Sequence, residues 1–173
     1  MATLKFAFLL ATLMMLAATA QALAITVDVC ATAATDARFD STGKFFTAAA
    51  PIYSGGTIAQ STAPIDCSTI TATPIGTFFT AGAFVTGLAG AGADDLALVT
   101  WHFRIGSRAF DTIGPVQATG GVFAAGQTYP QTVVGATHGI AAANSEATVT
   151  TLDSSGFVFE LKTSGSTDHK HKH

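Results

Sequence analysis

Residues Gln131–Leu161 read QTVVGATHGIAAANSEATVTTLDSSGFVFEL. Within them Glu146–Leu152 alternates between small or apolar side chains and polar ones, and Phe157–Leu161 alternates again. A period of two residues is typical of a strand with one face on a core. The loop Asp153–Gly156 is short enough to join these two strands into a hairpin, and Thr132–Gly135 is apolar and β-branched. The segment therefore predicts three strands of an antiparallel sheet.

The first 24 residues have the pattern of a secretory signal peptide. Lys5 precedes the apolar run Phe6–Leu16, and small residues before Ile25 fit an A-x-A cleavage site. The alternative is a membrane anchor, but the apolar run is shorter than the ~20 residues that a spanning helix needs. We predict a signal peptide over 1–24, one domain over 25–163 and a flexible His/Lys tail over 164–173. The mature protein is expected to be secreted, extracellular and free of the membrane.

The composition favours β structure and excludes two classes of partner. Of the 173 residues, 49% are hydrophobic and only 11% are charged. Helix surfaces usually carry more Glu, Lys and Arg than this, whereas Thr and Phe are common in strands. The formal net charge is -3, and no basic stripe or polybasic segment is present in the sequence. Nucleic acids and anionic lipids are therefore not expected as partners.

Two cysteines, Cys30 and Cys67, follow the predicted signal peptide. In an exported chain an even number of cysteines favours a disulfide. The alternative is two separate buried thiols. We predict that Cys30 and Cys67 are bonded.

Other segments share the two-residue period. The clearest are Ile25–Ala31, Ile75–Leu88 and Leu96–Ile105. Phe45–Thr47 begins a strand that Pro51 is expected to limit. Ala109–Ile113 is predicted as a strand that ends at the Gly114-Pro115 pair.

The remaining segments are predicted to be turns or irregular chain. They are Thr35–Lys44, Ser61–Pro74 with a short strand around Ser68–Thr71, and Thr119–Gln127. The chain thus has about seven to nine short strands and no convincing helix, which is typical of a sandwich or a barrel. Periodicity alone leaves both architectures open.

One turn motif favours the barrel. Residues Gly135–Val149 resemble a signature of the allene oxide cyclase and dirigent-like superfamily, in which a glycine-rich turn leads into a strand that begins with Glu or Gln. The matching residues are Gly135, Thr137, Ile140, Ala141, Ala143 and Glu146, and the departures are Ala136, His138 and Ser145. Upstream, Tyr53–Gly56, Ile75–Gly82 and Leu98–Pro115 resemble the early turn, long strand and hairpin of the family. The resemblance implies an eight-stranded antiparallel β-barrel, commonly a homotrimer, with a ligand cavity at the barrel mouth.

The resemblance also implies the kind of chemistry. Allene oxide cyclases close an unstable fatty-acid epoxide into a cyclopentenone, and dirigent proteins orient two phenoxy radicals that a separate oxidase produces. Both hold a reactive ligand in one geometry and exclude water. Neither uses a metal or an organic cofactor, so no cofactor is expected. The expected partners are a small hydrophobic or phenolic ligand, a separate oxidase and further copies of the chain.

Four residues are candidates for the site. Asp28 matches a carboxylate in the first strand of the cyclases, and as a buried acid it could be catalytic, or it could be a solvated charge at a strand end. Phe84 falls where the cyclases have a pocket cysteine. His102 and Arg104 share one strand face, and they would bind ligand in the cavity if Trp101 pointed outward. With Trp101 inward, they would be ordinary surface groups.

Two further features leave alternatives open. Asp94, Asp95 and Asp111 could also handle protons. In the tail, His169, His171 and His173 alternate with lysines and could chelate Cu(II) or Ni(II) weakly, or remain solvated. We predict no metal site.

Three functions therefore remain, and no hydrolase or phosphate-loop motif adds a fourth. The first is a secreted dirigent-like barrel that binds and orients a small apolar or phenolic ligand without catalysis of its own. The second is a cofactor-independent isomerase or cyclase acting on a reactive lipid or polyketide-type substrate. The third is a structural extracellular β-barrel without a working pocket. The first is the favoured prediction.

Overall fold

The computed structural model describes residues 24–32, 36–85, 96–117, 124–137 and 145–164. These residues form antiparallel strands and one short 3-10 helix, η1 (Cys67–Thr69). The strands are β1 (Thr26–Cys30), β2 (Ala37–Phe39), β3 (Phe45–Ser54), β4 (Gly76–Phe84), β5 (Leu96–Ile105), β6 (Arg108–Gln117), β7 (Thr128–Ala136), β8 (Glu146–Thr151) and β9 (Val158–Thr163). Eight of them close a barrel and β2 is an additional short strand, which confirms the predicted eight-stranded antiparallel β-barrel.

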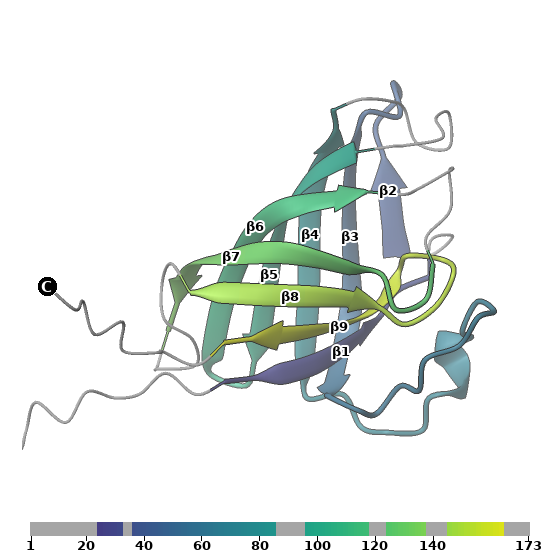
Figure 1. The fold of residues 1–173 in the computed structure, drawn as a ribbon, viewed down its shortest axis with the longest axis vertical. Coiled ribbons are helices and arrows are strands. Elements are labelled where there is room, and N and C mark those ends of the chain that lie inside the picture. The colour runs from purple at the N-terminus through teal and green to yellow at the C-terminus, as the bar shows by residue number, and fades with distance from the viewer. Residues whose placement is uncertain (1–23, 33–35, 86–95, 118–123, 138–144, 165–173) are drawn as a thin grey trace, which may run out of the picture.

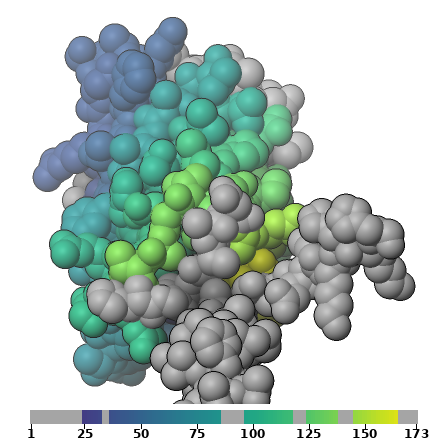
Figure 2. Space-filling view, turned by 90° about the vertical axis from the view of Figure 1, so that its left-hand side faces the viewer, coloured from purple at the N-terminus to yellow at the C-terminus, as the bar shows by residue number. Residues whose placement is uncertain are grey.

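The strands from β3 to β9 follow one another as a meander, each paired with the next (Figure 1). β9 then pairs with β1, and β1 pairs with β3, so the sheet closes on itself. In the space-filling view, the teal and green atoms of the middle strands lie against one another on one side of the barrel (Figure 2). Closure removes most of the free strand edges that an open sheet would expose.

β1 and β2 lie one after the other along the same edge of β3. From the pair Val29–Ile52 to the pair Ala37–Ala48, the first strand advances eight residues whereas β3 advances four. The two strands are therefore one barrel strand that is interrupted by four extra residues. Extra residues of this kind bend a strand and often re-aim the side chains around them.

Pro51 does not limit the strand that begins at Phe45, contrary to the sequence prediction. β3 continues to Ser54, and Pro51 pairs with Thr77 of β4. The C=O of Ile52 accepts a hydrogen bond from Ile75 on the β4 side, so the backbone of the preceding Pro51 faces the opposite edge. That edge lies at the interruption between β1 and β2, where the ladder needs no N–H from Pro51.

The Gly114-Pro115 pair does not end its strand either, because β6 continues to Gln117. Side chains of β7 take the place of ladder bonds here. Gln131 Nε2 donates to the Pro115 carbonyl at 3.2 Å, and the Tyr129 hydroxyl donates to the Gln117 carbonyl. A Cβ on Gly114 would lie 2.6 Å from Gln131 Nε2, so glycine makes room for the amide that satisfies the proline carbonyl.

Aromatic side chains fill the interior of the barrel. The Trp101 ring is 5% exposed and stacks on Phe159, with 4.5 Å between ring centroids. Phe103 stacks on Phe110 at 4.6 Å, and the ring of Phe78 packs against those of Trp101, Phe103 and Phe159. Trp101 therefore points inward. The described centre of the barrel is a packed core rather than a ligand cavity.

Residues 55–75, which we call the strap, leave the barrel after β3 and pack on its outer side (Figure 1). A second apolar cluster lies beneath the strap. Its members are Cys30, Tyr53, Ile58, Leu152 and Val158, with Ile65, Cys67 and Ile70 packed against them. The predicted disulfide between Cys30 and Cys67 is confirmed and ties the strap to β1.

Two buried carboxylates also hold the strap. Asp28 Oδ2 accepts the backbone N–H of Ile58 at 2.8 Å, and Asp153 Oδ2 accepts that of Ile65 at 2.8 Å. Both side chains are inaccessible to solvent. The strap is therefore fixed by one covalent bond, by two charge-assisted hydrogen bonds, which are stronger than neutral ones, and by the backbone hydrogen bond from the Ser61 N–H to the Leu152 carbonyl at 2.8 Å.

Some local predictions differ from the structure. The polar segment Thr35–Lys44 contains β2, because pairing with β3 outweighs its turn-like composition. Instead of a strand at Ser68–Thr71, the chain forms η1, whose first turn is capped by Asp66. The predicted strand Ile75–Leu88 corresponds to β4, which ends at Phe84. The signal peptide, the tail, Asp94, Asp95 and His138 lie outside the described residues, as does most of Thr119–Gln127.

Candidate functional site

Three phenylalanines face inward at the end of the barrel where β2 ends and β3 begins. Phe39 pairs with Phe46 across β2 and β3, and Phe46 pairs with Gly82 of β4. The ring centroids of Phe39 and Phe46 are 6.1 Å apart, and those of Phe46 and Phe84 are 5.4 Å apart. Phe39 is 46% exposed, and the other two rings are half-buried. We call this row of rings the aromatic rim.

Local sequence explains how the aromatic rim forms. A Cβ on Gly82 would lie 2.6 Å from the Phe46 ring, so the glycine provides the space in which that ring lies. Alternation along β4 brings Phe84 to the same face as Phe78 and Thr80. Phe46 and Phe84 pack against the aromatic core, which forms the floor beneath the rim. The rim therefore presents apolar ring faces above a closed floor.

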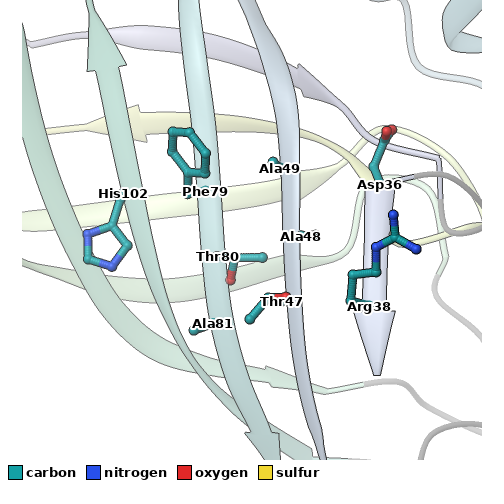
Figure 3. Close-up of a pocket in the computed structure, with 9 residues that line it drawn as sticks. All are labelled: Asp36, Arg38, Thr47, Ala48, Ala49, Phe79, Thr80, Ala81 and His102. Carbon is teal, nitrogen blue, oxygen red and sulfur yellow. The ribbon is translucent and has the colours of Figure 1, made fainter. Parts of the chain in front are cut away.

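A groove lies on the outer face of the same strands, at the interruption between β1 and β2. Its volume is about 510 Å³. The lining residues are Asp36, Arg38, Thr47, Ala48, Ala49, Phe79, Thr80, Ala81 and His102 (Figure 3). Small side chains on β3 and β4 form its floor, whereas larger ones stand on β2, β4 and β5. The depression arises because outward positions of β3 carry Thr47 and Ala49 where the neighbouring strands carry Arg38 and Phe79.

His102 is a polar residue of the groove whose ring contacts a neighbouring carboxylate. Its Nδ1 lies 2.9 Å from Asp111 Oδ1, and the two residues are direct partners in the pairing of β5 with β6. Gly135 of β7 lies opposite Asp111, where a Cβ would come within 3.5 Å of Asp111 Oδ2. A β-bulge in the pairing of β6 and β7 follows directly after Asp111. Asp111 fixes the orientation of the imidazole ring, with Nε2 at its far side from the carboxylate.

The four sequence-predicted site residues do not meet at one place. Phe84 belongs to the aromatic rim and His102 to the outer groove. Arg104 is exposed on the outer face of β5 and is not among the groove residues. Asp28 is buried outside the barrel, beneath the strap.

The environment of Asp28 is that of a structural anchor. Burial raises the pKa of its carboxyl, and backbone N–H groups at Ile58, Gly56 and Thr57 act in the opposite direction. Its Oδ1 is buried without a hydrogen-bond partner among the described residues. The carboxyl holds the strap and has no path to the barrel interior, because Val27 and Val29 on either side of it fill the inward positions of β1.

The sequence reasoning missed Phe39, Phe46 and Arg38 as site residues. Their positions depend on the pairing of β2 with β3, and β2 is too short to show a periodic signal. The pair Phe45-Phe46 could have indicated aromatic side chains at this end of the barrel, because adjacent strand residues face opposite sides and one of the two rings must point inward. Among the described residues no group of three or more His, Cys, Asp or Glu side chains is placed to hold a metal ion.

Comparisons of the chain with protein-family models, with curated proteins and with solved structures found no match. The resemblance to the allene oxide cyclase and dirigent-like superfamily thus stays a prediction from the motifs. No helix in the described ranges is long and apolar enough to cross a membrane. The disulfide agrees with a protein that matures in an oxidising compartment.

Proposed function

We propose that the protein is a secreted, dirigent-like barrel that binds and orients a small apolar or phenolic ligand at the aromatic rim, without catalysis of its own. The observation that carries this proposal is the row of partly exposed rings of Phe39, Phe46 and Phe84. Exposed aromatic faces above a closed apolar floor favour a flat, apolar ligand. The packed aromatic core keeps such a ligand at the end of the barrel.

The proposed role is positional. A phenolic ligand stacked on Phe46 or Phe84 loses rotational freedom. A second phenolic ligand, stacked on Phe39, would approach only one face of the first. Phenoxy radicals supplied by a separate oxidase would then couple with a biased stereochemistry. The side chains of the rim carry no acid or base, so no proton transfer is assigned to them.

The proposed function includes assembly with further copies of the chain. Outward-facing apolar side chains lie on neighbouring strands β5, β6 and β7, where Leu98, Ile113 and Val134 are exposed. An apolar face of this kind on a secreted barrel favours burial against another protein surface. Light scattering coupled to size exclusion measures the mass of the mature protein, and a monomer would remove this part of the proposal.

Two other functions are favoured less by the geometry. A cyclase or isomerase would need an acid in the barrel interior, and Asp28 lies outside it. A purely structural barrel is favoured by the filled interior, because the rings of Trp101 and its neighbours pack against one another in the part of the core that the structure describes. The partial exposure of the aromatic rim supports ligand binding over these two functions.

The test is titration of the mature protein with 8-anilinonaphthalene-1-sulfonate and with 4-propylphenol, followed by calorimetry. We expect binding by the wild type and at least tenfold weaker binding by Phe39→Ala and Phe84→Ala. Phe39 is partly exposed, so its replacement should leave the fold intact, and circular dichroism checks both variants. Phe79→Ala, which removes an outward-facing ring of the groove, is the matched control and should bind like wild type. No binding of either probe would refute ligand binding at the rim and favour the structural role.

Stereochemical steering has a separate readout. Oxidation of a 4-propenylphenol by a one-electron phenol oxidase gives a racemic coupled product without a director. With the wild-type protein present we expect an excess of one enantiomer, lost in Phe84→Ala. A racemic product despite measurable binding would show that the protein binds the phenol but does not direct the stereochemistry of coupling.

A further inference from the structure

We propose that the outer groove is a second binding site, and that it takes a sugar ring of a neutral oligosaccharide. The groove is on the opposite face of the sheet from the aromatic rim, because Phe79 and Phe84 differ by an odd number of strand positions. The inference therefore does not depend on the ligand proposed for the rim.

The dimensions suit an extended chain of sugar rings. A volume of about 510 Å³ lies within the usual range of ligand sites. The groove runs across four neighbouring strands, from Arg38 on β2 to His102 on β5. Three spacings between strands, at about 4.8 Å each, give the groove a length of roughly 14 Å. Its floor is flat because the side chains that form it, those of Thr47, Ala49 and Ala81, are all short (Figure 3).

Phe79 gives the groove an aromatic platform. It is 43% exposed and stands between Ala49 on β3 and His102 on β5. A ring face carries partial negative charge and attracts the weakly positive C–H groups that line one face of a pyranose. Leaving a large apolar ring in water has no packing benefit for the fold, whereas a sugar face would cover it.

The charges around Phe79 favour a neutral, hydroxyl-rich ligand. Arg38 contributes a guanidinium, and Asp36 contributes a carboxylate two positions earlier on the same side. Asp36 Oδ2 accepts the backbone N–H of Thr32 at 2.7 Å, which holds this carboxylate in place. An anion would meet the charge of Asp36, and a cation would meet that of Arg38. Sugar hydroxyls both donate and accept, so they can use groups of either sign.

His102 completes this set at the opposite wall. Asp111 holds its Nδ1 at 2.9 Å, so the ring is oriented before a ligand arrives. Such pre-orientation lowers the entropy cost of each hydrogen bond to the ligand. We expect Nε2 to bond a hydroxyl of the sugar that stacks on Phe79, while Arg38 bonds the next sugar along the groove.

The test is calorimetric titration of the mature protein with neutral hexasaccharides of β-1,4-glucan, β-1,3-glucan, β-1,4-mannan and chitin. At least one should bind, and Phe79→Ala should weaken its binding tenfold or more. His102→Ala should weaken it by about threefold to tenfold. The matched control is Phe45→Ala, which removes another outward-facing exposed ring of the same sheet, on β3 and outside the groove, and should have no effect.

Several outcomes would overturn the inference. One is the absence of binding by every hexasaccharide at about 5 mM. Another is tighter binding of the anionic hexamer of galacturonic acid than of the neutral ones, since this would assign the groove to an anion. A third is a dimer of wild type that Phe79→Ala dissociates, which would make a second copy of the chain the occupant. Phe39→Ala should bind sugar normally, so failure at the rim and failure at the groove are distinguishable.

Discussion

Breaking the disulfide of the strap tests how the barrel is stabilised. Cys30 and Cys67 are separated by 37 residues. In the chain-entropy account, a cross-link that closes a loop of this length raises the free energy of unfolding by about 4 kcal/mol, because it restricts the unfolded chain. Cys67→Ser removes the bond and leaves the buried Cys30 thiol in its apolar surroundings, so little packing is lost.

The folded barrel should survive this change. Hydrogen bonds from Ile58 to Asp28 and from Ile65 to Asp153 still hold the strap, and the apolar cluster beneath it remains. The perturbation therefore acts mainly on the unfolded state. We expect a native-like β spectrum, with a lower free energy of unfolding.

Urea unfolding, followed by the emission of the buried Trp101, measures the difference. With a slope of about 2 kcal/mol per molar urea, the midpoint should fall by about 2 M. Reduction of wild type with dithiothreitol should give the same shift, and Cys67→Ser should not respond to the reductant. A change below about 1 kcal/mol in the variant, with the wild-type disulfide verified by mass mapping, would refute the entropic argument.

Three further perturbations have defined outcomes. Burial raises the pKa of the Asp28 carboxyl above its ordinary value of 3.8, so the folded state holds this proton more tightly than the unfolded chain, and the associated stability is lost as pH rises above that value. Asp28→Asn should lose that slope and be more stable than wild type at pH 7; lower urea midpoints for the variant at neutral pH would contradict this. Phe159→Ala removes the ring stacked on Trp101 and should cost about 3–5 kcal/mol, with a red-shifted tryptophan emission; an unchanged spectrum would show that the ring is not packed as described. Gly76→Ala would place a methyl group against the backbone carbonyl of Arg104, which cannot move without disturbing β5, so thermal unfolding should show a loss of about 1–3 kcal/mol; an unchanged melting temperature would argue against this strand pairing.

The sequence predicted those parts of the fold that depend on local alternation. Leu96–Ile105 was predicted with the bounds of β5, because each inward residue is apolar and the outward ones include His102 and Arg104. The Cys30–Cys67 bond followed from an even count of cysteines in a chain with a predicted signal peptide. Which face of β5 looks inward was left open, since Leu98 makes the outward face partly apolar as well.

The errors came from residues whose meaning depends on distant strands. Pro51 and Pro115 are poor strand residues in isolation. Each, however, lies on one side against a neighbouring strand with which it makes no regular backbone hydrogen bonds, so the missing N–H is not needed. Asp28 matched a pocket carboxylate in type, yet the strap, which lies more than 25 positions along the chain, covers it. The groove could not be predicted, because it requires the register of β2 on β3, which no local pattern encodes.

The interruption between β1 and β2 has a consequence for engineering the protein. The two strands keep separate registers on β3, so the ladder does not fix the length of the chain that joins them. The free-energy cost of closing a loop grows only slowly with its length, by about 0.6 kcal/mol for each doubling of the number of residues. A grafted epitope or an additional binding loop inserted between Thr32 and Asp36 should therefore be tolerated. It would be displayed directly beside Arg38, where it could widen or narrow the range of molecules that the outer groove selects.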